Sequence, residues 1–146
     1  MVEWLSEPQA RAWRGYRRMF LLLNAQIARD LGRNGLSEAD YDVLSTLSET
    51  KDGARIKYLG AHLLWSQSRL SHHITRMQQR GLVTREDCPG DARGAIVALS
   101  TEGRQAIEDA APGHVESVRR HFIDLLTPAQ IEAFGEIADT VVERLS

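Results

Sequence analysis

The stretch from Ser66 to Leu99 constrains the fold of this chain most, because it predicts a capped helix followed by two short strands. Between Gln67 and Gln79, apolar residues recur at spacings of four and three, at Leu70, Ile74 and Met77. That spacing is typical of an amphipathic helix with one buried face. Ser66 can accept a backbone hydrogen bond at its first turn, and Gly81 suits the left-handed residue that ends a helix.

Two β segments follow this helix directly. Leu82–Arg85 and Ala95–Leu99 are typical of strands, and Cys88-Pro89-Gly90-Asp91 between them has the composition of a turn. The two segments therefore predict a hairpin with a loop of roughly eight residues.

Two further helices are predicted upstream. Ser37 and Asp40 have the spacing of a capping box, and an apolar face follows at Tyr41, Leu44 and Leu47. Lys51-Asp52-Gly53 ends this helix, and a short helix comes next, with its inward residues at Ile56, Leu59 and Leu63. Three compact helices followed by a hairpin are the order of a winged helix-turn-helix.

Long amphipathic helices are expected on both sides of this lobe, over Pro8–Leu31, Thr101–Leu126 and Pro128–Leu145. The second is expected to kink at Pro112-Gly113. Thr127 and Gln130 form another capping box at the start of the third. Each helix has a near-heptad apolar seam, and a winged helix of about 70 residues leaves these seams little core to cover.

We therefore expect the outer helices to join two copies of the chain. The predicted fold class is mainly α (α+β): a winged helix-turn-helix with a two-stranded β-hairpin wing and N- and C-terminal dimerisation helices. Residues 1–146 form one domain, with the winged-helix lobe at 36–100 and the dimerisation helices at 8–31 and 101–146.

Charge is distributed unevenly along the chain, although its net charge is only -2. No Asp or Glu occurs from Gly53 to Arg85, while cations occur at Arg55, Lys57, Arg69, Arg76, Arg80 and Arg85. A surface without acid suits the phosphates of nucleic acid.

The polar face of the helix over Gln67–Gln79 is a candidate for reading double-stranded DNA. Its first residues, Gln67, Ser68, Arg69, Ser71 and His72, could enter the major groove, where Gln pairs with adenine and Arg with guanine. Arg76 and Arg80 lie further along and would reach phosphates. The alternative for any one of these residues is an ordinary solvated helix face.

The hairpin loop carries one more candidate. Arg93 lies near Gly90 and Gly94, and a small loop with one arginine can enter a narrow minor groove. Asp91 either shapes the turn or sets the direction of Arg93.

The run from Leu36 to Arg104 resembles the MarR family of bacterial winged-helix regulators. The matching stretches are Leu36-Ser-Glu-Ala-Asp-Tyr-Asp-Val-Leu44, Ser66-x-Ser68-x-Leu70-Ser71, Arg80-Gly-Leu-Val-x-Arg85, Asp91-x-Arg93 and Val97-x-Leu99-Ser-Thr-x-Gly103. The resemblance implies a homodimer that binds a palindromic operator, usually as a repressor relieved by a small ligand or an oxidant. It also implies that Arg93 is the minor-groove arginine and that the major-groove readers are Ser68, Arg69, Ser71 and His72.

In that family, anionic aromatic effectors tend to bind where the dimer arm meets the DNA-binding lobe. Trp13, Tyr16 and Arg17, with Trp65, are the candidates here for binding a phenolic carboxylate. The alternative is that these aromatic side chains serve only for packing.

Other chemistries find less support in the sequence. Cys88 is the only cysteine, which excludes an internal disulfide and fits a reducing cytoplasm. Family members that sense oxidants use a cysteine near the N-terminus, which this chain lacks, so a redox role for Cys88 is left as an alternative. His72-His73 and the pair His114 and His121 do not have the spacing of a zinc site, so no metal and no cofactor is expected, and a metal-responsive regulator is left as an alternative.

An enzyme is not expected, because the chain has no Gly-x-Ser-x-Gly, phosphate-binding glycine loop or His-Glu-x-x-His. Neither a signal peptide nor a membrane span is apparent, so a cytoplasmic protein without membrane contact is expected. The alternative is a winged helix that binds only other proteins, although its basic face favours DNA.

Overall fold

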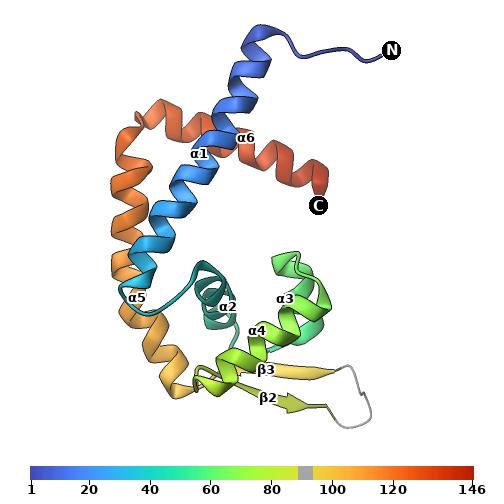
Figure 1. The fold of residues 1–146 in the computed structure, drawn as a ribbon, viewed down its shortest axis with the longest axis vertical. Coiled ribbons are helices and arrows are strands. Elements are labelled where there is room, and N and C mark those ends of the chain that lie inside the picture. Colours follow the sequence, from blue (N-terminus) through green and yellow to red (C-terminus); the bar gives the residue numbers. More distant parts are fainter. Residues whose placement is uncertain (89–93) are drawn as a thin grey trace. The chain divides into compact units, whose positions relative to one another are not determined.

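A computed structural model of this chain describes residues 1–88 and 94–146. The elements, in order, are α1 (Glu7–Gly32), α2 (Glu38–Ser48), β1 (Ala54–Arg55), α3 (Ile56–Leu63), α4 (Gln67–Gln79), β2 (Val83–Asp87), β3 (Ala95–Leu99), α5 (Thr101–His121), the 3-10 turn η1 (Ile123–Leu125) and α6 (Pro128–Leu145) (Figure 1). This order confirms the predicted fold, in which helices dominate and a hairpin follows the third compact helix.

The chain divides into two compact units. The central unit is Asp30–Gly113, and the terminal unit combines Met1–Arg29 with His114–Ser146. Helix α5 contributes residues to both units.

The core of the central unit comes from α2, α3, α4 and the sheet. Its largest fully buried side chains are Val43, Leu44, Leu47, Leu59, Leu70, Ile74, Met77 and Val97. Each such side chain contributes roughly 1.5–3 kcal/mol through its removal from water. Ile107 and Ala110 of α5 are buried in the same core, so this core extends past the hairpin.

The sheet has one strand more than the sequence predicts. Its order is β1-β3-β2, with β2 antiparallel to β3 and Ala54 of β1 opposite Val97. Strand β1 is only two residues long. A segment of that length cannot show the alternation by which strands are recognised in a sequence.

The expected helix boundaries depend on caps, and most of these caps are present. Ser37 with Asp40 and Thr127 with Gln130 each form a complete capping box. Gly81 has a φ of +77°, which confirms the left-handed end of α4. Leu64 also lies in the left-handed region, with a φ of +56°, where it ends α3.

Helix α5 is shorter than predicted. It ends at His121, before η1, whereas a helix to Leu126 was expected. Leu126 is extended because it leads into the cap at Thr127 and Pro128. Because the apolar spacing continues across this break, the pattern in the sequence does not show that the helix ends there. The helix runs through Pro112, and the kink expected there stays a prediction.

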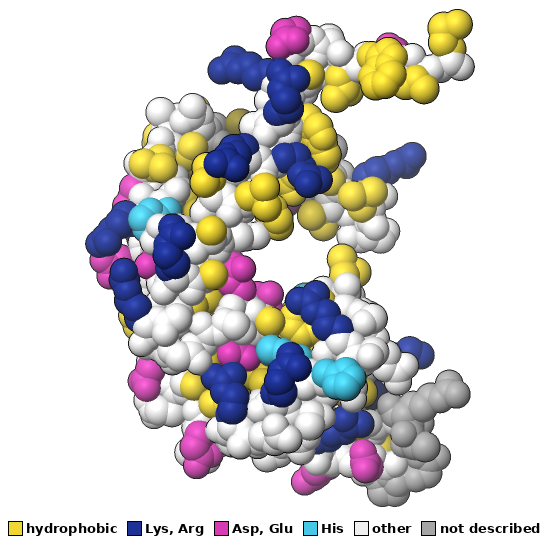
Figure 2. Space-filling view, viewed as in Figure 1, with side chains coloured by type: hydrophobic (Ala, Val, Ile, Leu, Met, Phe, Trp, Pro, Cys, Tyr) yellow, Lys and Arg dark blue, Asp and Glu magenta, His cyan; other side chains and the backbone are white. Residues whose placement is uncertain are grey.

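The terminal unit leaves many apolar side chains exposed. No residue of α6 is buried, and exposed apolar side chains on its surface include Phe134, Val141 and Leu145. Trp13, Tyr16 and Phe20 are about half exposed on α1, and Figure 2 shows such apolar side chains along both helices. No helix among the described residues is long and apolar enough to cross a membrane.

Candidate nucleic-acid interface

Helix α4 presents one polar face to solvent. The Ser66 hydroxyl accepts a hydrogen bond from the Arg69 amide at 3.1 Å, which fixes the start of the helix. Leu70, Ile74 and Met77 are buried as predicted. The predicted reading residues Gln67, Ser68, Arg69, His72 and Arg76 are all exposed, and Ser71 is half-buried.

Arg69 lies over an aromatic ring. Its guanidinium carbon is 4.1 Å from the centroid of the Trp65 ring, which is a cation–π contact. The Trp65 ring also meets His73 edge-on, with their centroids 5.5 Å apart and an interplanar angle of 83°. Trp65 therefore joins the exposed arginine to a buried residue of the same helix.

His73 contacts a second arginine of α4. Its Nδ1 lies 3.2 Å from Nη2 of Arg76. Because a guanidinium can only donate, Nδ1 must accept, and we assign the proton of the neutral ring to Nε2. Nε2 lies 2.9 Å from Oδ1 of Asp40, close enough for electrostatic attraction although the two groups are not aligned as a hydrogen bond.

The surroundings of His73 favour its neutral form. Burial lowers the pKa of His73, Asp40 opposes that shift, and the charges of Arg76 and Arg69 strengthen it. The net result is a pKa below the ordinary value of 6.5, so the ring is neutral near pH 7.

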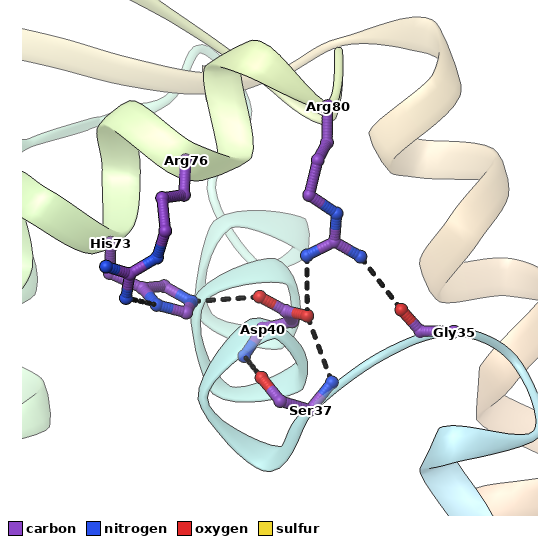
Figure 3. Close-up of polar contacts among 6 residues, drawn as sticks. All are labelled: Gly35, Ser37, Asp40, His73, Arg76 and Arg80. Carbon is purple, nitrogen blue, oxygen red and sulfur yellow. Dashed lines mark hydrogen bonds and ion pairs between the residues drawn. The ribbon is translucent and has the colours of Figure 1, made fainter.

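Asp40 connects α4 to α2 (Figure 3). Its Oδ2 accepts hydrogen bonds from Nη1 of Arg80 at 2.8 Å and from the Ser37 amide at 3.0 Å. Burial by itself would raise the pKa of Asp40, but these hydrogen bonds and the charges of Arg80 and His73 outweigh it and hold the pKa below its ordinary range. Asp40 is therefore ionised although it is buried, with 4% of the whole residue exposed.

The structure gives Arg80 a role within the protein, and its expected phosphate contact stays a prediction. Besides Asp40, its guanidinium donates through Nη2 to the Gly35 carbonyl at 2.8 Å. Arg80 therefore joins the end of α4 to the start of α2, with two of its five N–H donors bonded within the protein. The sequence could not show this, because the partners lie 40 and 45 positions away along the chain.

Asp40 and His73 are structural parts of the site that reasoning from sequence missed. Each carried a signal. Asp40 is the third residue of a capping box, and His73 falls between the buried positions Leu70 and Ile74 on the apolar side of α4. A titratable side chain in such a position needs a buried partner.

The other predicted residues are placed as follows. Arg93 and Asp91 lie outside the described residues. Trp13, Tyr16 and Arg17 are on α1 in the terminal unit, with the rings of Trp13 and Tyr16 5.6 Å apart, whereas Trp65 is in the central unit. Across residues 1–88 and 94–146, no group of three or more His, Cys, Asp or Glu side chains could hold a metal ion.

Comparison with known proteins gives a consistent result. The model of the MarR family matches residues 34–94. The crystal structure of AbsC, a MarR family transcriptional regulator from Streptomyces coelicolor, is 39% identical with a TM-score of 0.92, and the match covers 99% of this chain and 98% of AbsC.

Sco3205, a MarR family transcriptional regulator from the same organism crystallised in complex with DNA, is 36% identical with a TM-score of 0.93, covering 100% of this chain and 92% of that chain. YkoM, an uncharacterized HTH-type transcriptional regulator from Bacillus subtilis, is 24% identical over 113 residues, which are 77% of this chain and 73% of YkoM.

Proposed function

This chain belongs to the MarR family of DNA-binding transcriptional regulators, and we propose that it acts as a homodimer that binds a palindromic operator. The observation that carries the proposal is the exposed face of α4, where Arg69 and Arg76 are each held by a neighbouring ring. The structure of Sco3205 with DNA supports the assignment, since that protein is similar over the full length of this chain.

Helix α4 is the proposed reading helix. Gln67, Ser68, Arg69 and His72 are exposed near its N-terminal end, which is the end that reaches base edges when such a helix enters the major groove. Ser71 completes the proposed readers, and Arg76 lies one turn beyond it. Arg93 is proposed as the minor-groove arginine of the wing, with Asp91 setting its direction.

The outer helices supply the proposed dimer contact. The seam of Ile131, Phe134, Val141 and Leu145 on α6 is exposed in one chain, at 39%, 39%, 50% and 81%. A large exposed apolar surface marks an interaction site, and a near-heptad seam suits a second helix. A two-fold dimer places two reading helices about 34 Å apart, one turn of DNA, which suits a palindrome.

Repression relieved by a small aromatic acid is the proposed regulation. Trp13 and Tyr16 supply exposed rings on α1, and Arg17 supplies a cation beside them. Trp65 belongs to the central unit and already contacts Arg69 and His73, so this proposal rests on the α1 residues.

The test begins with selection of binding sites from a random double-stranded DNA library by the purified protein. The selected duplex should contain an inverted repeat, and sedimentation should show two chains on each duplex. Fluorescence anisotropy at a stated salt concentration then compares variants. Arg69→Ala with Arg76→Ala should weaken binding at least about tenfold, because base and phosphate contacts are lost.

The matched control is Arg33→Ala. Arg33 is an exposed arginine of the same unit, but it pairs with Asp30 and lies outside α4. Its replacement should change affinity less than about twofold. Two results would contradict α4 as the reading helix: failure to enrich any duplex, and a loss of affinity in Arg33→Ala equal to that in the Arg69 and Arg76 double variant. A stable monomer would contradict the dimer.

A further inference from the structure

We propose that Trp65 and His73 are positioning residues that direct Arg69 and Arg76 and so determine operator specificity. The inference rests on the proposed function of α4 as the reading helix. It assigns to Trp65 a role in DNA recognition that differs from effector binding, and to His73 a role although its side chain is buried.

The contact of Arg69 with Trp65 leaves the arginine able to read a base. The Trp65 ring lies against the carbon of the guanidinium, while the N–H donors point outward from the edges of this planar group. In the described part of the chain, these donors make no hydrogen bond to another residue. Arg69 is therefore held in place with its hydrogen-bonding capacity intact, which suits a bidentate contact to guanine.

An arginine that is already ordered in the free protein favours DNA binding, because a mobile side chain must be immobilised when it contacts a base. The loss of rotamer freedom opposes binding, and a side chain that is already ordered loses less. The same ordering favours one direction of the donor fork over others. The expected benefit is greater discrimination between base pairs, with a smaller effect on general affinity for DNA.

Arg76 is directed by the same pair of rings. Its Nη2 donates to Nδ1 of His73 at 3.2 Å, and the His73 ring in turn meets the edge of Trp65. The two arginines therefore share one support, made of Trp65 just before α4 and His73 on α4 (Figure 3 shows His73 with Arg76). A change at either ring should affect both.

The support is anchored outside α4. Oδ1 of Asp40 on α2 lies 2.9 Å from Nε2 of His73, and Oδ2 accepts from Arg80 and from the Ser37 amide. One carboxylate oxygen of Asp40 is directed at the His73 ring, and the other accepts from residues at the ends of α4 and α2. The orientation of His73 is consequently tied to the packing of the whole lobe.

The experiment uses full-length protein and the duplex selected by the wild type. Affinity is measured for this duplex and for every single-base-pair variant of one half-site, at one salt concentration. Arg69→Ala should flatten the preference at one base pair. Trp65→Met, which keeps an apolar side chain but removes the ring, should reduce the preference at that same pair about three- to thirtyfold.

Two comparisons separate positioning from general damage. Trp65→Phe keeps an aromatic face and should restore most of the discrimination. In the double variant Trp65→Met with Arg69→Ala, discrimination at the base pair that Arg69 reads should be no lower than in Arg69→Ala alone, because at that pair the ring acts through Arg69. Tyr58→Leu is the control for loss of a ring, since Tyr58 is exposed on α3 and stacks on His62.

The stack can also be observed without DNA. The Arg69 side-chain proton resonances of the wild type should show an upfield ring-current shift that Trp65→Met abolishes. Absence of the shift in the wild type overturns the proposal even if a variant fails to fold. An equal loss of affinity for all duplexes in Trp65→Met overturns it too, whereas a wild type that prefers no duplex instead contradicts the proposed function.

Discussion

Nη1 of Arg80 donates to Oδ2 of Asp40 over 2.8 Å, and this contact joins the last turn of α4 to the first turn of α2. The carboxylate is 6% exposed and the arginine side chain 43%, so the acid depends on the pair more than the base does. A buried carboxylate without a partner destabilises the folded state. The first role of Arg80 is therefore to stabilise the fold.

We therefore expect Arg80→Ala to lower the free energy of unfolding by about 1–2 kcal/mol, less than for a fully buried pair because Arg80 is partly exposed to solvent. Urea unfolding at one fixed protein concentration measures the loss. The slope of the logarithm of DNA affinity against the logarithm of salt concentration should stay unchanged. A slope smaller by about one would instead assign Arg80 to a phosphate.

The free energy of unfolding should depend on pH through the two buried titratable groups, His73 and Asp40. The pKa of His73 is below 6.5 because of its burial, so the unfolded chain takes up this proton first. Stability from the neutral ring is complete above pH 6.5 and is lost as the pH falls through the pKa of the folded state. Around the ring, the groups that set this behaviour are Asp40 on α2 and Arg69 and Arg76 on α4.

We expect the free energy of unfolding of His73→Gln to decrease less than that of the wild type as the pH falls just below 6.5.

The contribution of Asp40 to stability changes at lower pH. Its stabilisation is present above its ordinary pKa of 3.8 and is lost as the pH falls through the lowered pKa of the folded state. Denaturant titrations at a series of pH values test both points, and identical profiles for His73→Gln and wild type would contradict the first.

Gly103 should tolerate no side chain. A methyl group built on it would overlap the carbonyl oxygen of Leu82, which is backbone and cannot move aside easily. Gly103→Ala should cost about 3 kcal/mol or more, since overlap with a fixed group forces the start of α5 away from the hairpin. Thermal unfolding measures the cost.

Gly113→Ala is the matched control for that change. It lies on the same helix, and a methyl group at this position would have no neighbouring atom within 4 Å. Alanine there should be neutral or stabilising by about 1 kcal/mol through its higher helix propensity. Equal effects of the two substitutions would argue against a steric origin.

Leu64 offers a substitution that stabilises. It has a φ of +56° while 90% of its surface is exposed, so the side chain contributes strain and almost no burial. Leu64→Gly should raise the free energy of unfolding by about 0.5–1 kcal/mol, and Leu64→Ala, which keeps the Cβ atom, should not. Glycine less stable than alanine at this position would contradict the prediction.

Val141→Asp should separate the two chains of the proposed dimer. Val141 is half exposed on the α6 seam, and a carboxylate placed in an apolar interface loses its hydration without a partner. We expect the dimer dissociation constant to rise at least about tenfold in sedimentation equilibrium. Asp139→Lys changes a charge on the opposite side of α6, and its dimer should persist.

Much of this fold was predictable because its boundaries depend on local chemistry. The caps at Ser37, Ser66 and Thr127 and the left-handed Gly81 act over three or four residues, a distance at which sequence patterns are informative. The bounds of α4 and β3 matched the prediction for this reason.

Features that depend on distant partners were not predictable. Strand β1 exists because Ala54 and Arg55 pair with β3, across more than forty positions, and Arg80 finds Asp40 over a similar separation. For the candidate site, the exposed face of α4 followed from spacing. The contacts of Arg69 and Arg76 did not, since ring stacking depends on rotamers and on packing from α2.

The stacking of Arg69 on Trp65 restricts how a descendant of this protein could acquire a different binding site. Replacing the arginine alone would uncover an indole ring, and replacing the ring alone would loosen the arginine. New preferences should therefore arise through joint replacement at positions 65 and 69, so that selection acts on the pair and the two positions vary together among proteins that descend from this one.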